Sequence, residues 1–231
     1  MFFDPIYLLF ALPGLALSLW AQFKVKSTFH KYSQVAPRSG ISGAEAAAQL
    51  IRQRGVSGVR IEETGGMLSD HYDPFHKVLR LSHDVYHGRS LAALGVAAHE
   101  AGHAIQHARA YGPLKWRSLL VKPASIGSNF GVILASIGLL LQAGSLTIFG
   151  IILFSAAVLF TLVTLPVEFD ASKRAVVALQ ELRIVTPAEA GGASAVLNAA
   201  ALTYVAAALT AVLQLLYFLM RAGVLGERRE E

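Results

Sequence analysis

The chain has 231 residues, of which 54% are hydrophobic and 15% charged, and its formal net charge is +5. A composition this apolar indicates a membrane protein. The lack of cysteine excludes disulfides, thiolate-bound zinc and thiol nucleophiles, and the basic residues form no stripe interleaved with aromatics, so we expect no nucleic-acid partner.

Four segments are long and apolar enough to span a bilayer of about 30 Å, at residues 6–23, 124–142, 145–165 and 199–220. Fourteen of the twenty Lys and Arg residues lie between Lys24 and Lys122, and the turn between the second and third segments holds none. The positive-inside rule then predicts a multi-pass protein of the cell membrane with residues 24–122 and 166–198 forming a cytoplasmic lobe. We expect one membrane-embedded domain, 1–231.

Within this lobe, Ser42 and Glu45 form a capping-box pattern that predicts a short helix ending near Arg54, with Gly55 as its stop. Residues 56–62 and 77–82 alternate as strands do, with Gly65-Gly66 and the "DHYDPF" loop between them. We expect these two strands to form a small hairpin near the helix described next.

The stretch "GVAAHEAGHAIQHARA" carries six alanines and no proline, and Ser90 upstream is suited to an N-cap, which predicts a helix over 91–109. Residues four apart lie on one helix face about 5–6 Å apart, so His99 and His103 can direct two ring nitrogens at one metal ion. Glu100 lies about 100° around the helix from His99, too far to be a comfortable ligand but within reach of a water on the metal.

The alternative is a helix face that is merely rich in histidine. Small apolar residues surround the polar groups, and burying two imidazoles and a carboxylate without a partner costs several kcal/mol. We therefore favour one zinc ion per chain, with Glu100 in the general-base position of a zinc peptidase.

Catalytic zinc takes three protein ligands and keeps one position for water. His107 lies about 6 Å further along the helix axis than His103, out of reach of a shared ion, and Arg109 occupies the position of the third histidine of metzincins. Glu168, in "LPVEFDASKRA" just past the third span, is the best remaining candidate. The alternative for Glu168 is a solvated carboxylate or an ion pair with Lys173 or Arg174.

The motifs "AAHEAGHAIQ" and "LPVEFDAS", separated by a membrane hairpin, resemble those of the YugP-like membrane zinc metallopeptidases. This bacterial family is distantly similar to HtpX-type proteases and CAAX prenyl proteases. The likeness extends from the first span to the last and includes "DHYDP" and "LRLS". It implies that His99, His103 and Glu168 bind zinc and that Glu100 is the base.

HtpX-type enzymes carry an aspartate four residues after the ligating glutamate, where this chain has Ser172. The carboxylate that accepts a hydrogen bond from a ligating histidine is therefore unassigned. Asp170 is one candidate, and an ordinary solvated loop residue is an equally good interpretation of it.

The predicted activity is hydrolysis of peptide bonds in membrane or membrane-proximal proteins. Strand 77–82 offers main-chain groups to an extended peptide, or is an ordinary hairpin strand. The residue that steadies the oxyanion stays open among six candidates: His71, Tyr72, His76, His83, Tyr86 and His87.

Three other classes compete with this peptidase. An intramembrane protease needs an Asp-Gly motif that the sequence lacks, and a metal transporter needs ionisable residues that the four segments lack. A non-catalytic zinc-binding scaffold or assembly factor remains the alternative. The predicted fold class is mainly α, a polytopic membrane protein of about four spans whose zincin-like lobe carries a β-hairpin; the oligomeric state is not predicted.

Overall fold

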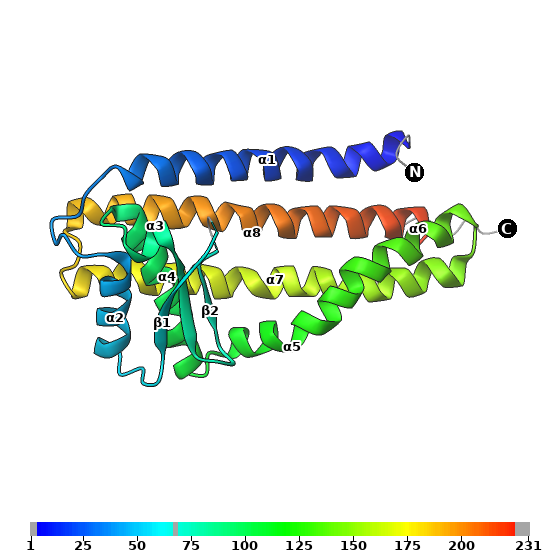
Figure 1. Cartoon of the computed structure of the whole chain (residues 1–231). Helices are drawn as coiled ribbons and strands as arrows, with labels where there is room; N and C mark the ends of the chain where they lie inside the picture. Colours follow the sequence, from blue (N-terminus) through cyan, green and yellow to red (C-terminus); the bar gives the residue numbers. More distant parts are fainter. Residues whose placement is uncertain (1–3, 67–68, 225–231) are drawn as a thin grey trace. The chain divides into compact units, whose positions relative to one another are not determined.

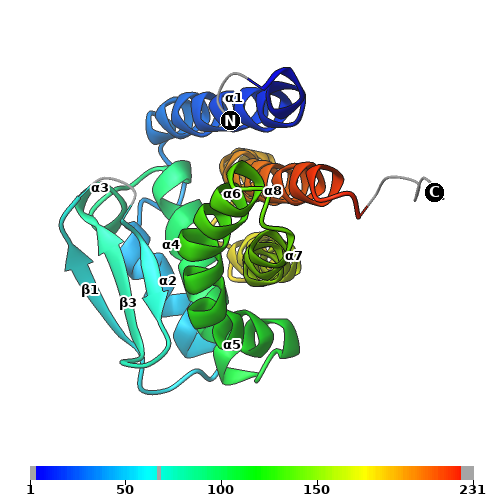
Figure 2. The same ribbon diagram turned by 90° about the vertical axis from the view of Figure 1, so that its right-hand side faces the viewer.

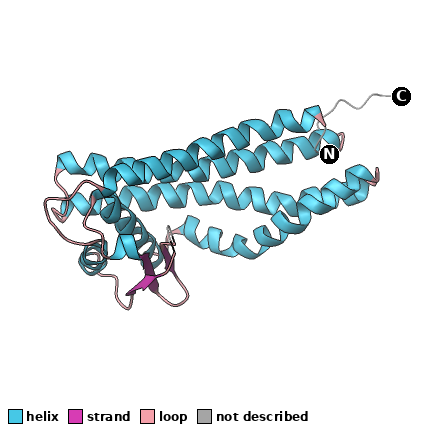
Figure 3. Ribbon diagram, turned by 45° about the horizontal axis from the view of Figure 1, so that its top comes forward, coloured by secondary structure: helices cyan, strands magenta, loops and turns pink. Residues whose placement is uncertain are grey.

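The computed structural model describes residues 4–66 and 69–224, and it is mainly helical with one small sheet (Figure 3). The elements follow one another along the chain as α1 (Pro5–Ser33), α2 (Gly43–Gln53), β1 (Arg60–Thr64), β2 (His71–Asp73), β3 (Val78–Ser82), α3 (His83–Tyr86), α4 (Leu91–Ala108), α5 (Gly112–Ile126), the π-helical turn η1 (Gly127–Gly131), α6 (Val132–Leu140), α7 (Gly144–Glu181) and α8 (Pro187–Arg221).

Four helical stretches are long and apolar enough to cross a membrane, as predicted: Pro5–Ser33, Gly112–Leu140, Gly144–Glu181 and Pro187–Arg221 (Figure 1). Three of them extend beyond the predicted segment at both ends, whereas the second begins earlier, at Gly112, and ends at Leu140, short of the predicted limit of 142. The third bears most directly on the candidate site, because α7 continues past Pro166 and carries the "EFDAS" motif within the helix. The interpretation of Asp170 as a loop residue was therefore wrong.

The described residues form two compact units, the first comprising 4–20, 115–165 and 203–224. Its core contains Ile151, Phe154 and Phe218, while many large apolar side chains such as Leu140 and Leu159 stay exposed. Exposed apolar surface of this kind suits contact with lipid. A Cβ added at Gly150 would lie 2.2 Å from the backbone nitrogen of Ala135, so the α6–α7 hairpin closes only with glycine here.

The second unit, residues 21–114 and 166–202, holds every residue singled out above as a candidate ligand or base. Its sheet has the order β1-β3-β2, with α2 contacting β1 and α4 contacting β2 and β3 (Figure 2). The core of the unit is built from the apolar faces of α2, α4 and β3, including Leu50, Leu79 and Leu94, together with residues of α7 and α8 such as Leu179 and Leu197.

The two predicted strands, 56–62 and 77–82, do pair with each other, but the expected antiparallel hairpin was wrong. β1 and β3 pair in parallel, with Glu63 opposite Leu81, and the antiparallel partner of β3 is the three-residue β2. β2 arises from the "DHYDPF" segment that was expected to be a loop. Because β3 has a neighbour on both sides, it is the central strand, and the edges are β1 and β2.

The two helix starts predicted in this unit are confirmed. Ser42 caps α2, accepting from the Glu45 amide at 3.2 Å, and the Glu45 carboxylate accepts from the Ser42 amide at 2.6 Å, which completes the capping box. Ser90 caps α4 by accepting from the Ala93 amide at 3.2 Å, and α4 ends with Arg109 as its C-cap.

Candidate metal centre and active site

Helix α4 holds the two histidines in an almost fully buried position. Fourteen of its eighteen residues are buried, because alanine and glycine on several faces let α2, the sheet and other helices approach closely. His99 and His103, one turn apart, have ring centroids 4.7 Å from each other, and their side chains are 12% and 9% exposed. α4 is not among the four candidate spans found in the described residues.

Glu168 enters the same space from α7. Its Oε2 atom lies 3.2 Å from Nε2 of His99 and 3.5 Å from Nε2 of His103, and its side chain is 2% exposed. The alternatives of a solvated carboxylate or an ion pair with Lys173 or Arg174 therefore do not describe it, and Arg174 pairs instead with Asp170.

The three side chains form a donor set that suits a zinc ion. Tetrahedral zinc with bonds of about 2.0–2.2 Å places neighbouring donor atoms roughly 3.3–3.5 Å apart. The distances of 3.2 and 3.5 Å from the Glu168 oxygen to the two imidazole nitrogens match this spacing. Two imidazoles and one carboxylate are also the donor set of catalytic rather than closed structural zinc sites.

Hydrogen bonds fix which nitrogen of His103 faces the candidate site. The Gln106 amide nitrogen donates to the Val167 carbonyl and to Asp170 Oδ2, both at 2.8 Å. Both partners can only accept, so the amide nitrogen of Gln106 faces them and its Oε1 faces Nδ1 of His103, 3.0 Å away. Oε1 therefore accepts a hydrogen bond from Nδ1–H. Since Nδ1 of His103 is committed to Gln106, Nε2 is the nitrogen that faces Glu168 and would bind a metal ion.

His99 has a different partner. Its Nδ1 lies 3.0 Å from the hydroxyl of Ser172, the residue that replaces the expected aspartate. A hydroxyl both donates and accepts, so this contact orients the ring without imposing one tautomer. Ser172 and Gln106 thus complete the environment of the two rings, and Asp170 acts one step further out, between Gln106 and Arg174.

The electrostatic environment favours a cation at His103. Burial by itself lowers the pKa of His103, but the hydrogen bond with Glu168 and the charges of Glu100 and Glu168 outweigh it, so the pKa is raised. The same field that stabilises a proton on this ring stabilises a metal cation beside it.

Glu100 follows His99 on α4 and is 9% exposed. Its charge also reaches Asp70, whose pKa is raised chiefly by burial and further by Glu100. Asp70 accepts hydrogen bonds from the backbone amide of Ser82, at 2.8 Å, and from its hydroxyl, at 3.0 Å. These bonds tie the segment before β2 to the end of β3, beside the candidate base.

His107 does not join the cluster formed by His99, His103 and Glu168, in agreement with its position one turn further on. Its Nδ1 lies 2.9 Å from the hydroxyl of Tyr72, which links α4 to β2. Among the six residues weighed for the oxyanion role, Tyr72 is thus bonded to the histidine helix, whereas His83 and His87 contact Glu63.

Sequence inspection missed Gln106, Ser172 and Asp70. A weak signal existed for Gln106, which is three residues after His103 and so lies next to it on the helix surface. Ser172 was noticed only as a departure from a pattern, and Asp70 gave no signal. All three contact residues distant in the sequence. Gln106 and Val167 are 61 residues apart, Ser172 and His99 are 73 apart, and Asp70 and Ser82 are 12 apart.

Four apolar helices with a buried two-histidine, one-glutamate cluster define a membrane protein with a candidate metal centre. Residues 7–223 match the family described as "Putative neutral zinc metallopeptidase", and the chain belongs to that family. It is 47% identical over 215 residues, 93% of this chain and 96% of the relative, to "Putative membrane protease YugP" of Bacillus subtilis (strain 168). No solved structure matches the chain.

Proposed function

We propose that the protein is a membrane-bound zinc-dependent endopeptidase in which His99, His103 and Glu168 hold the metal and Glu100 is the general base. The observation that carries the proposal is the spacing of 3.2 and 3.5 Å between one Glu168 oxygen and the two Nε2 atoms. Membership of a zinc metallopeptidase family supports it.

Zinc bound there would supply a Lewis acid that lowers the pKa of a bound water toward neutrality. The protein's own groups do the rest. Gln106 and Ser172 hold the two imidazoles in place, and the carboxylate of Glu100 accepts the proton of the attacking water and later delivers it to the leaving amine. Burial of Glu100 and Glu168 keeps bulk water from the charges.

The substrates we propose are proteins in or next to the membrane. With β3 central in the sheet, an added peptide strand would have to pair with an edge, and β2 is the edge that contacts α4. Main-chain pairing at an edge accepts many sequences, which suits an endopeptidase. We treat residues 1–231 as one functional domain, because α7 carries both an apolar span and Glu168.

The decisive experiment uses the full chain in detergent and compares wild type with Glu100→Gln, Glu168→Gln and His107→Ala. Zinc per chain and cleavage of labelled casein and a random peptide library are measured. We expect about one tightly held zinc in all but Glu168→Gln, and cleavage only by wild type and His107→Ala. If Glu168→Gln keeps its tight zinc, or Glu100→Gln still cleaves, the assignment fails. Tight zinc without cleavage by the wild type favours the scaffold alternative.

We also propose that the second unit, with the candidate centre, faces the cytoplasm of the cell membrane, from the excess of basic residues between Lys24 and Lys122. The chain has no cysteine, so single cysteines report orientation directly. An impermeant thiol reagent applied to intact cells should label Ser145→Cys, in the first turn of α7, and should spare Ser57→Cys until the membrane is opened. The reverse pattern would invert the topology.

A further inference from the structure

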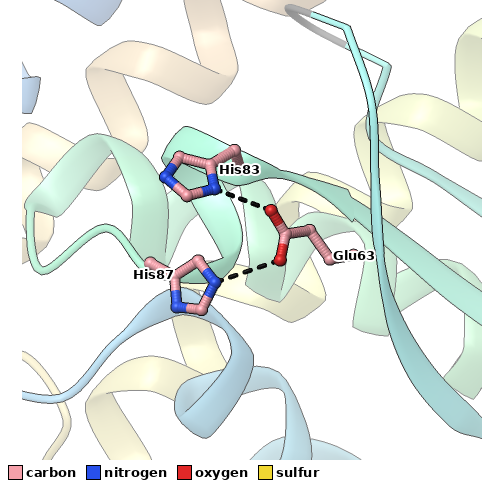
Figure 4. Close-up of side chains that lie close together, drawn as sticks. All are labelled: Glu63, His83 and His87. Atoms are coloured by element: carbon pink, nitrogen blue, oxygen red, sulfur yellow. Dashed lines mark hydrogen bonds and ion pairs between the residues drawn. The ribbon is translucent and has the colours of Figure 1, made fainter.

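A second group of metal-binding side chains lies on the surface of the second unit, formed by Glu63, His83 and His87. Figure 4 shows both imidazoles opposite the end of the Glu63 carboxylate, each facing a different oxygen. Nδ1 of His83 lies 2.6 Å from Oε1, and Nε2 of His87 lies 3.1 Å from Oε2. One donor atom from each residue lies within 4.8 Å of the other two.

Local structure explains why the three meet. β1 runs parallel to β3, so Glu63 lies opposite Leu81, and α3 begins directly after β3 at His83. His87 follows four residues later as the C-cap of this one-turn helix, which brings its ring to a centroid distance of 4.9 Å from His83. The cluster therefore joins an edge strand to the segment that leads into α4.

A hydrogen-bonded ion pair is the simpler explanation of the cluster. The side chains are 73%, 56% and 42% exposed for His83, His87 and Glu63, and exposed pairs of this kind contribute little stability. Hydrogen bonds from both rings hold the pKa of Glu63 below its ordinary value, so the carboxylate is charged.

We propose that Glu63, His83 and His87 form a second binding site for a divalent transition-metal cation, distinct from the buried cluster on α4 and α7. Two imidazoles and one carboxylate are ligands that Zn²⁺ shares with its neighbours in the first transition row. Water completes the coordination, because the site is open to solvent. The cation clamps β1 to α3.

The test titrates the metal-stripped full chain in detergent with Zn²⁺ against a chromophoric chelator. Wild type should bind two zinc ions and His87→Ala and Glu63→Gln one each. Losing an outer partner of a metal ligand already weakens binding about 10–100-fold, so losing a ligand should weaken it at least about 100-fold. His30→Ala, which removes another exposed histidine of the same unit, is the matched control and should still bind two.

The chain with His103→Ala separates this proposal from the proposed function. There we expect one zinc, lost on adding His87→Ala, and a zinc-dependent rise in melting temperature that disappears with it. If Glu63→Gln and His87→Ala bind as much zinc as His30→Ala, the second site does not exist, whatever the buried cluster does. If His103→Ala binds as much zinc as wild type, the buried site fails while the surface site stands.

Discussion

Replacing Gly102 by alanine, which adds a single methyl group, should push apart the two helices that carry the candidate zinc ligands. Gly102 lies on α4 beside His103, and a Cβ built there would lie 2.8 Å from the backbone oxygen of Ala171 on α7 and 3.3 Å from its carbonyl carbon. An ordinary contact begins near 3.4 Å, so one helix segment must move by about 0.6 Å. The neighbour is backbone and cannot rotate away.

The size of the effect follows from two opposing terms. Overpacking of a buried site costs about 1–3 kcal/mol, whereas glycine to alanine within a helix gains up to about 1 kcal/mol. Gly95 on the same helix provides a matched control, because its added Cβ would meet Ala193 at 3.4 Å or more. Gly95→Ala should therefore be neutral or slightly stabilising, and Gly102→Ala should be less stable than it by about 1–3 kcal/mol.

Zinc binding should change in parallel. A shift of about 0.6 Å between α4 and α7 alters the distances of 3.2 and 3.5 Å from Glu168 to His99 and His103, and ligand constellations tolerate only about 0.5 Å. We expect zinc affinity at this site to fall roughly 10–100-fold in Gly102→Ala and to be unchanged in Gly95→Ala. Chelator competition and thermal unfolding in detergent measure both quantities. Equal stability and equal affinity of the two variants would refute the close helix contact as the determinant of ligand spacing.

Four further results are expected. Gln106→Leu removes the acceptor of His103 Nδ1 and should weaken zinc binding about 10–100-fold. Ser172→Asp supplies a carboxylate to His99 and should strengthen zinc binding. Chelator competition measures both affinities, and an affinity equal to that of wild type would contradict the prediction for that variant. Zinc at 100 times its dissociation constant stabilises by about 2.7 kcal/mol, so a chelator should lower the melting temperature of wild type by roughly 5–10 °C. A much smaller fall is expected for Glu168→Gln. In metal-free buffer, the pKa of Glu63 is lower in the folded protein than its unfolded value of 4.5, so the charged carboxylate stabilises the fold above pH 4.5. This stability is lost as the pH falls through the folded-state pKa. The melting temperatures of wild type and Glu63→Gln should therefore converge as the pH falls through this range.

The helices and the candidate ligands were predictable because their signals are local. Ser42 and Ser90 cap α2 and α4 through contacts three residues apart, and the spacing of His99 and His103 needs only helical geometry. Glu168 came from elimination among the few carboxylates on the same side. The structure brings it to the two histidines, as that prediction requires.

The sheet and the hydrogen-bond partners were not predictable by the same means. Alternation identifies a strand but carries no information on its partner or direction, and β2, with three residues, is too short to give a periodic signal. The predicted third span ends at residue 165, yet α7 continues through Pro166 as far as Glu181. The partners of Gln106 and Ser172 depend on how α4 meets α7, which no local pattern specifies.

The small residues of α4 have a second role beyond helix propensity. Four alanines of this helix are fully buried: Ala97, Ala98, Ala101 and Ala104. A larger side chain at any of these positions would hold the neighbouring element further away. With larger residues the backbones of α4 and α7 would separate, and a Glu168 carboxylate would no longer reach both imidazoles. The short distance between α4 and α7 thus requires alanine and glycine around the "HEAGH" motif. Gly102→Ala is the smallest change that would increase this distance.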